Sequence, residues 1–175
     1  LEVSVESGAV NTRIVDGQFA ASPWVPLVAL SVGDGEDREV SLNVEGLAVL
    51  EELDCAGLEF DMLEIFGLSR LSRIVCSDNR LRSLDLAGVP ALQELDCAGN
   101  SLMVLDLRSC PRLRTVDCSG NEISALLVAS PSPLEKLLCG RNDLMVLEIG
   151  SQPELRELNC YRNALAHLNI ESAPQ

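Results

Sequence analysis

From Val40 to the end of the chain, short apolar runs alternate with polar turns at a fixed period of 21 residues. The stretch from Leu92 to Pro111 shows one full unit, with the pattern L-x-x-L-x-C-x-x-N-x-L-x-x-L-x-L-x-x-x-P. Six copies follow one another, beginning at Leu50, Leu71, Leu92, Leu113, Leu134 and Leu155. Self-similarity at a period of this length is typical of a solenoid, in which each copy forms one coil and neighbouring coils stack.

Each unit carries two inward-facing apolar runs, which we call the first and the second wall of the coil. Alternate residues of a strand share a face, so the spacing predicts a short strand in the first wall, with the second apolar run on the opposite wall. In the third coil these inward residues are Leu92, Leu95 and Cys97 on the first wall, and Leu102, Leu105 and Leu107 on the second. A single coil cannot bury such side chains, whereas a stack can. We expect this narrow core to favour aliphatic residues and cysteine over aromatic rings, which make up only 3% of the chain.

Two further residue types recur in phase with the leucines. Cysteine ends the first wall of every copy, at Cys55, Cys76, Cys97, Cys118, Cys139 and Cys160. Asparagine follows three residues later, at Asn79, Asn100, Asn121, Asn142 and Asn163, with Leu58 in that place in the first copy. An amide side chain both donates and accepts, so we expect these asparagines to be buried and paired with backbone groups of the turn. Prolines such as Pro111, which lack an N–H, mark the return corner.

These residues resemble the leucine-rich repeat family, whose strand segment reads L-x-x-L-x-L-x-x-N-x-L. Cysteine in place of the third leucine is similar to the cysteine-ladder variety found in internalin-like surface proteins of bacteria. The resemblance covers about three quarters of the chain. It implies an α/β-class leucine-rich-repeat solenoid that is mostly parallel β, with few or no helices, coiled right-handed into a curved array. It also implies a function in binding, outside the cell or on its surface, and no catalysis.

The chain divides into three parts by this pattern. Residues 1–37 carry no repeat, and their apolar alternation predicts strands near Leu1–Val5, Thr12–Val15 and Trp24–Val32. We interpret them as an N-terminal β cap, because the open end of a solenoid exposes leucines and an unpaired strand edge. Residues 38–49 form a half-repeat that brings Leu42 and Val44 into register with the array, and residues 50–175 form the array itself.

The spacing of the seven cysteines favours buried free thiols over disulfides or a metal site. Ladder cysteines on neighbouring parallel strands should lie about 4.8 Å apart, with side chains that point the same way rather than toward each other. The C-x-x-C pairs typical of zinc sites do not occur in the sequence. Cys110 is the one cysteine outside the ladder, and its place beside Pro111 at the corner predicts an accessible thiol.

The formal net charge of −14 disfavours nucleic acid and anionic membranes as partners, because both attract lysine and arginine. No apolar run reaches the roughly 20 residues of a membrane span. The acidic turn at 33–37 lacks EF-hand spacing, so a solvated turn is preferred over a calcium site. The single histidine, His167, lies near Cys160 in sequence, but that thiol is expected to point into the core. We therefore expect no catalytic residue, cofactor or metal.

Candidate ligand-binding residues stand at the outward positions of the first wall and at the turn beside it. They change from acidic in the middle of the array to tyrosine and arginine near its C-terminal end. The candidates are Asp54, Asp96, Asp117, Leu138, Arg141, Asn159, Tyr161 and Arg162. Tyrosine and arginine are enriched in interface hot spots. The alternative is that this end is only the solvated end of an acidic protein.

The second wall carries apolar residues at positions that are polar or small in other copies, namely Met103, Val104, Leu127, Met145 and Val146. If they face outward they form a patch over three coils, which is typical of an association surface and could support weak self-association. The alternative is that neighbouring side chains cover them. The sequence therefore predicts a non-enzymatic module that binds a protein or a glycan, on or outside a bacterial cell. The alternative function is a structural spacer or self-associating stalk without an external ligand.

Overall fold

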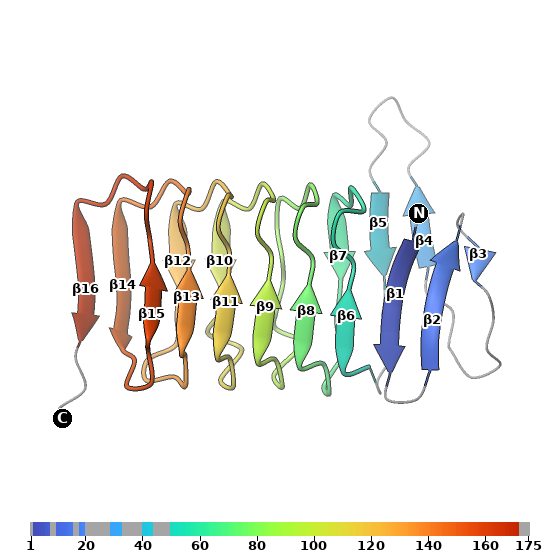
Figure 1. Ribbon diagram of the computed structural model, residues 1–175, viewed down its shortest axis with the longest axis horizontal. Coiled ribbons are helices and arrows are strands. Elements are labelled where there is room, and N and C mark those ends of the chain that lie inside the picture. The colour runs from blue at the N-terminus through green and yellow to red at the C-terminus, as the bar shows by residue number, and fades with distance from the viewer. Residues whose placement is uncertain are drawn as a thin grey trace.

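The computed structural model describes residues 2–7, 10–15, 18–19, 29–32, 40–43 and 50–171. Each copy of the repeat forms one coil, and its two walls run in opposite directions (Figure 1). The first wall consists of β6 (Glu52–Asp54), β8 (Arg73–Val75), β9 (Glu94–Asp96), β11 (Thr115–Asp117), β13 (Lys136–Leu138) and β15 (Glu157–Asn159). The second wall contains β7 (Met62–Glu64), β10 (Val104–Asp106), β12 (Ala125–Leu127), β14 (Val146–Ser151) and β16 (His167–Glu171). The described residues form no helix, so the predicted mostly parallel β-solenoid is confirmed.

The first wall is a continuous sheet in which residues 21 apart stand beside each other. Thr115, for example, pairs in parallel with Glu94 on one side and Lys136 on the other. The second wall is interrupted: β10 pairs with β12 and β14 pairs with β16, whereas residues 82–86 of the second coil form no strand. The first wall is therefore the more regular platform for side chains.

Strands of the N-terminal region join both walls. β1 (Glu2–Ser7) lies antiparallel to β6, and β2 (Val10–Val15) and β3 (Gln18–Phe19) continue this sheet. β4 (Ala29–Val32) pairs antiparallel with β5 (Val40–Asn43), which pairs in parallel with β7.

Some of the predictions for the N-terminal region can be compared with the structure, and others concern residues that it does not describe. Leu42 stands opposite Leu63, one repeat ahead, as the half-repeat requires. The strands predicted at the start of the chain and at Thr12–Val15 match β1 and β2. Trp24, Val44 and the turn at 33–37 lie outside the described residues, and the capping role of residues 1–37 remains a prediction.

The core lies between the two walls and holds the inward residues of both. In the third coil, all six predicted inward side chains are at most 2% exposed. Phe60 corrects the expectation that rings are left out, because it is 1% exposed at the position that Leu81 and Leu102 occupy in later coils. The first coil lacks the turn asparagine, and the backbone N–H of Phe60 donates to Oδ1 of Asn79 in the next coil at 3.0 Å.

The asparagines form the buried ladder that the repeat predicts. Asn121 Nδ2 donates to the carbonyl oxygens of Cys118 in its own coil, at 3.1 Å, and of Cys97 in the preceding coil, at 3.0 Å. Its Oδ1 accepts from the N–H of Leu102 at 3.1 Å. The same arrangement recurs at Asn79, Asn100, Asn142 and Asn163. Each asparagine therefore ties one coil to the coil before it.

All seven cysteines are free thiols, and six of them are buried. Burial raises the pKa of Cys55 and of Cys139 to about 12, and nearby aspartates add to the rise. Cys160, in the last coil, is half-buried. The ladder thus consists of neutral thiols that pack as small apolar side chains.

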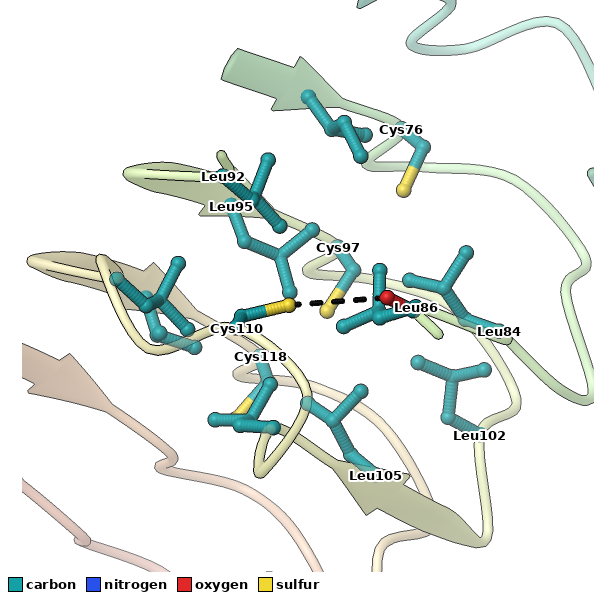
Figure 2. Close-up of a cluster of buried hydrophobic side chains, with 14 of the residues drawn as sticks. Cys76, Leu84, Leu86, Leu92, Leu95, Cys97, Leu102, Leu105, Cys110 and Cys118 are labelled. Atoms are coloured by element: carbon teal, nitrogen blue, oxygen red, sulfur yellow. Dashed lines mark hydrogen bonds between the residues drawn. The ribbon is translucent and has the colours of Figure 1, made fainter. Parts of the chain in front are cut away.

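The prediction of an accessible Cys110 is wrong. Its side chain is 1% exposed and points into the core, where Sγ lies 3.9 Å from the carbonyl oxygens of Leu86 and Val89 (Figure 2). The physical reason is its place in the coil, because Leu68 and Val89 occupy the same position in the first two coils and are fully buried. Burial raises the pKa of Cys110 to about 11.

Gln152 fills that same corner position in the fifth coil, although it is polar. It is 6% exposed, and its amide nitrogen donates to the carbonyl oxygens of Ala129 and Ile149 at 2.8 and 2.6 Å. Its Oε1 accepts from the Ser132 hydroxyl at 2.6 Å. Every buried side-chain nitrogen or oxygen of the described residues has a hydrogen-bond partner.

Candidate functional site

The outer face of the first wall contains a depression of about 280 Å³ that crosses five coils. Four of the predicted ligand-binding residues line it, namely Asp54, Asp96, Asp117 and Leu138. The other four, Arg141, Asn159, Tyr161 and Arg162, lie outside it, toward the C-terminal end of the array. The structure therefore divides the predicted set into a central group and a terminal group.

Sequence reasoning missed a second outward column that lines the same depression. Arg73, Glu94, Thr115 and Lys136 stand two residues before the aspartate column, on the same face of the strands. Strand alternation was the available signal, because residues two apart share a face. Cross-strand ion pairs hold this column. A guanidinium nitrogen of Arg73 lies 3.6 Å from a carboxylate oxygen of Glu52, and another lies 3.3 Å from one of Glu94. Lys136 Nζ lies 3.0 Å from a carboxylate oxygen of Glu157.

The aspartates of the depression also have a local structural role. One carboxylate oxygen of Asp54, of Asp96 and of Asp117 accepts the backbone N–H two residues later, at 3.0–3.2 Å. This bond closes the turn at the end of each strand. The Ser119 hydroxyl adds a bond to Asp117 at 2.6 Å, and that of Ser77 adds one to Asp96 at 3.3 Å. These bonds hold the carboxylates in place on the face. Asp54 is exposed to solvent, and Asp96 and Asp117 are half-buried.

The terminal group is organised around Tyr161, whose side chain is 47% exposed. Its ring covers Gly140 of the preceding coil so closely that a Cβ at that glycine would overlap the ring. The guanidinium carbon of Arg141 lies 5.7 Å from the ring centroid, within the range of a cation–π contact. The structure thus brings Tyr161 and Arg141 together.

Arg141 and Arg162 share an unusual backbone conformation. Their φ angles are +55° and +52°, in the left-handed region, where equivalent positions in the first, third and fourth coils carry glycine. A non-glycine residue in such a conformation costs of order 1–3 kcal/mol. Both side chains are exposed, so packing in the core does not account for the arginines.

The second wall exposes the predicted apolar patch. Met145 is 67% exposed, Met103 59%, Val104 51%, Val146 48% and Leu127 37%. These side chains therefore face outward and are not covered by their neighbours.

The described residues hold no group of three or more histidine, cysteine, aspartate or glutamate side chains placed to bind a metal ion. His167 is exposed at the start of β16. In the part of the chain that the structure describes, no helix is long and apolar enough to cross a membrane.

Residues 90–128 match the family of leucine-rich repeats, in a profile that spans two copies. The chain has no significant match among curated proteins. The functional domain of InlJ from Listeria monocytogenes, which includes a cysteine ladder, is similar in structure, with a TM-score of 0.51 and 24% sequence identity. The match covers 67% of this chain and 31% of that one, so this chain spans about a third of the length of InlJ's domain. At this identity the likeness concerns the fold. The chain therefore has the fold of a leucine-rich-repeat solenoid, with a ladder of cysteines along its first wall.

Proposed function

We propose that this solenoid is a non-enzymatic module that binds a protein partner on the outer face of the first wall. The observation that carries the proposal is the contrast between the two sides of that wall. The inward residues are leucine, isoleucine, valine or cysteine in every coil, whereas the outward residues change in charge and size from coil to coil. Stacking requires the inward pattern, and nothing in stacking requires the outward variety.

The chemistry of this face fits a protein interface. The depression is lined by four carboxylates, two cations, a threonine hydroxyl and the apolar side chains of Val75 and Leu138. Mixed polar and apolar surface is typical of non-obligate protein interfaces. The depression offers no aromatic ring on which a sugar could stack, which favours a protein over a glycan. Tyr161 and the two arginines extend the surface with residue types found in hot spots.

We place this activity on or outside a bacterial cell. The support is the resemblance of the repeat to internalin-like surface proteins, together with thiols that burial protects from oxidants. The net charge of −14 supports a protein surface with a basic region as the partner.

Capture by the immobilised domain tests the proposal. Thr115→Trp places a large side chain in the centre of the depression, and Ser109→Trp makes the same change at an exposed corner as a control. We expect the first variant to lose at least tenfold in affinity for proteins captured by the wild type, and the control to bind normally. Tyr161→Ala with Arg162→Ala tests the terminal group in the same assay. Retained capture by both site variants would place binding elsewhere on the molecule, and no specific capture by the wild type would favour a spacer. Specific binding on a glycan array would replace the protein partner with a sugar.

A further inference from the structure

We propose that the apolar patch of the second wall is a separate binding surface, and that it takes a protein segment with apolar side chains flanked by lysine or arginine. The patch comprises Met103, Val104, Leu127, Met145 and Val146. It lies on the opposite wall from the depression, so it does not depend on the function proposed above. The inference rests on the shape, charge and size of the patch.

Two outward positions of the patch carry large side chains in the third and fifth coils and small ones in the fourth coil between them. Met103 and Met145 lie one repeat before and after Ser124, and Val104 and Val146 lie one repeat before and after Ala125, which pairs with Val104. Coils on either side of a shared neighbour lie about 10 Å apart, since adjacent strands are separated by about 4.8 Å. A partner side chain can therefore approach Ser124 between two methionines, or Ala125 between two valines. Methionine is flexible and polarizable, which suits contact with apolar side chains of varied shape.

The rim of the patch is acidic. Glu122 and Asp143 lie on one side of it and Glu148 on the other, all exposed and without an ion pair among the described residues. Arg108, which follows the patch residue Val104 in the third coil, is neutralised by Asp106, to which it donates two side-chain hydrogen bonds of 2.9 and 2.7 Å. Arg82, in the second coil, lies at the edge beyond Met103. The uncompensated charge around the patch is therefore negative, and a partner with lysine or arginine complements it.

A second copy of this chain is a poor occupant. It would bring the same acidic rim and a net charge of −14 into contact with an identical surface. A stable interface also involves roughly 20–30 residues on each side, whereas the patch supplies five. As the occupant of the patch, a basic partner is therefore favoured over a second copy of this chain, which the sequence suggested.

The repeat itself supplies a variant that removes four of the five patch side chains and uses residues that already occur at the equivalent positions of another coil. Met103→Ser, Val104→Ala, Met145→Ser and Val146→Ala together give the third and fifth coils the residues that the fourth coil already carries at these positions. All four side chains are exposed, so the core stays intact. Gln93→Ala, at an exposed position on the other side of the molecule, is the control.

The probe is a fluorescent amphipathic peptide of leucine and lysine, titrated by anisotropy into the full chain. We expect the wild type and Gln93→Ala to bind it, and the fourfold variant to bind at least about tenfold more weakly, because the variant loses most of the apolar surface that the peptide would bury. A leucine–glutamate peptide, and a serine–lysine peptide without apolar residues, should bind at least tenfold more weakly to the wild type. Glu122→Gln with Asp143→Asn and Glu148→Gln should slow association and reduce its dependence on salt.

Three results would overturn the proposal. The first is equal affinity of the fourfold variant and the wild type for the leucine–lysine peptide. The second is a wild-type dimer in analytical ultracentrifugation that the fourfold variant abolishes, which would make a second copy the occupant. The third is binding to zwitterionic lipid vesicles that is lost in the variant, which would make the patch a membrane contact. Circular dichroism and urea unfolding of the variant show that its fold is retained.

Discussion

The turn asparagine acts on two coils at once. Asn121 donates to carbonyl oxygens of its own coil and of the preceding one, and it accepts an N–H from the preceding coil as well. Asn121 is only 8% exposed, so water has little access to the backbone groups with which its side chain forms hydrogen bonds. The cost of removing it is therefore a property of the interface between coils and not of one turn.

Asn121→Ala should lower the free energy of unfolding by roughly 1–3 kcal/mol, because it leaves buried backbone groups without partners. Asn121→Asp should lower it further, since the variant keeps an acceptor, loses the donor and adds a buried charge. Urea unfolding of the two variants measures both effects.

Asn163→Ala provides the internal comparison. It makes the same change in the last coil, where the side chain is only half-buried and water can replace part of what is lost. We expect a smaller loss of stability there than at Asn121. If all three variants unfold like the wild type, the assignment of the turn asparagines as ties between coils is wrong.

The sequence predicted some residues better than others for a physical reason. Cysteines and asparagines repeat in every coil, so their surroundings follow from the period alone. Cys110 does not repeat as cysteine, and its neighbour Pro111 suggested exposure, yet its position aligns with Leu68 and Val89. In the first three coils and in the fifth, this corner position is buried whatever residue occupies it, including the polar Gln152; in the fourth coil Pro131 takes the position and is exposed.

Strands and walls explain which parts of the candidate site could be predicted. The outward aspartates could be predicted because each precedes a ladder cysteine. Arg73, Thr115 and Lys136 lie two residues earlier on the same strand face, and finding them required the strand alternation to be extended to that position. The interruption of the second wall was not predictable. Residues 82–86 have the same apolar spacing as the segments that form strands, and nothing in the structure explains the difference.

The N-terminal strands carry a prediction at the level of elements. β1 lies antiparallel to β6, with Val5 opposite Leu53, and β5 lies parallel to β7. Deletion of residues 1–37 would uncover the backbone edge of β6 beside a first coil whose core includes Leu53 and Phe60. Exposed strand edges pair with other chains, so we expect aggregation or loss of cooperative unfolding.

Size-exclusion chromatography and urea unfolding of the deletion variant measure these outcomes. Deletion of residues 1–7 alone removes β1 but leaves β4 paired with β5, and it should give an intermediate result. A deletion variant lacking residues 1–37 that stays monomeric and unfolds in one cooperative step would mean that the segment does not cap the array.

At the scale of the whole molecule, the cysteine ladder makes stability depend on alkaline pH. Burial holds the folded-state pKa of Cys110 at about 11 and those of Cys55 and Cys139 at about 12, against an ordinary value of 9.0. Burial also raises the pKa of Cys76, Cys97 and Cys118. Unfolding lets these thiols ionise, so their contribution to stability is complete below about pH 9 and is lost as the pH rises through the folded-state values.

The free energy of unfolding should therefore fall steeply between about pH 9 and 12, by about 1.4 kcal/mol per pH unit for each thiol that ionises only on unfolding. Urea unfolding at a series of pH values measures the slope, and Cys97→Ala should reduce it, whereas Cys160→Ala, at a half-buried position, should reduce it less. Thiol labelling of the native protein below pH 9 gives the companion measurement, with Cys160 as the one cysteine expected to react. A flat profile, or native labelling of Cys110 and the inner ladder, would mean that solvent reaches the core between the coils.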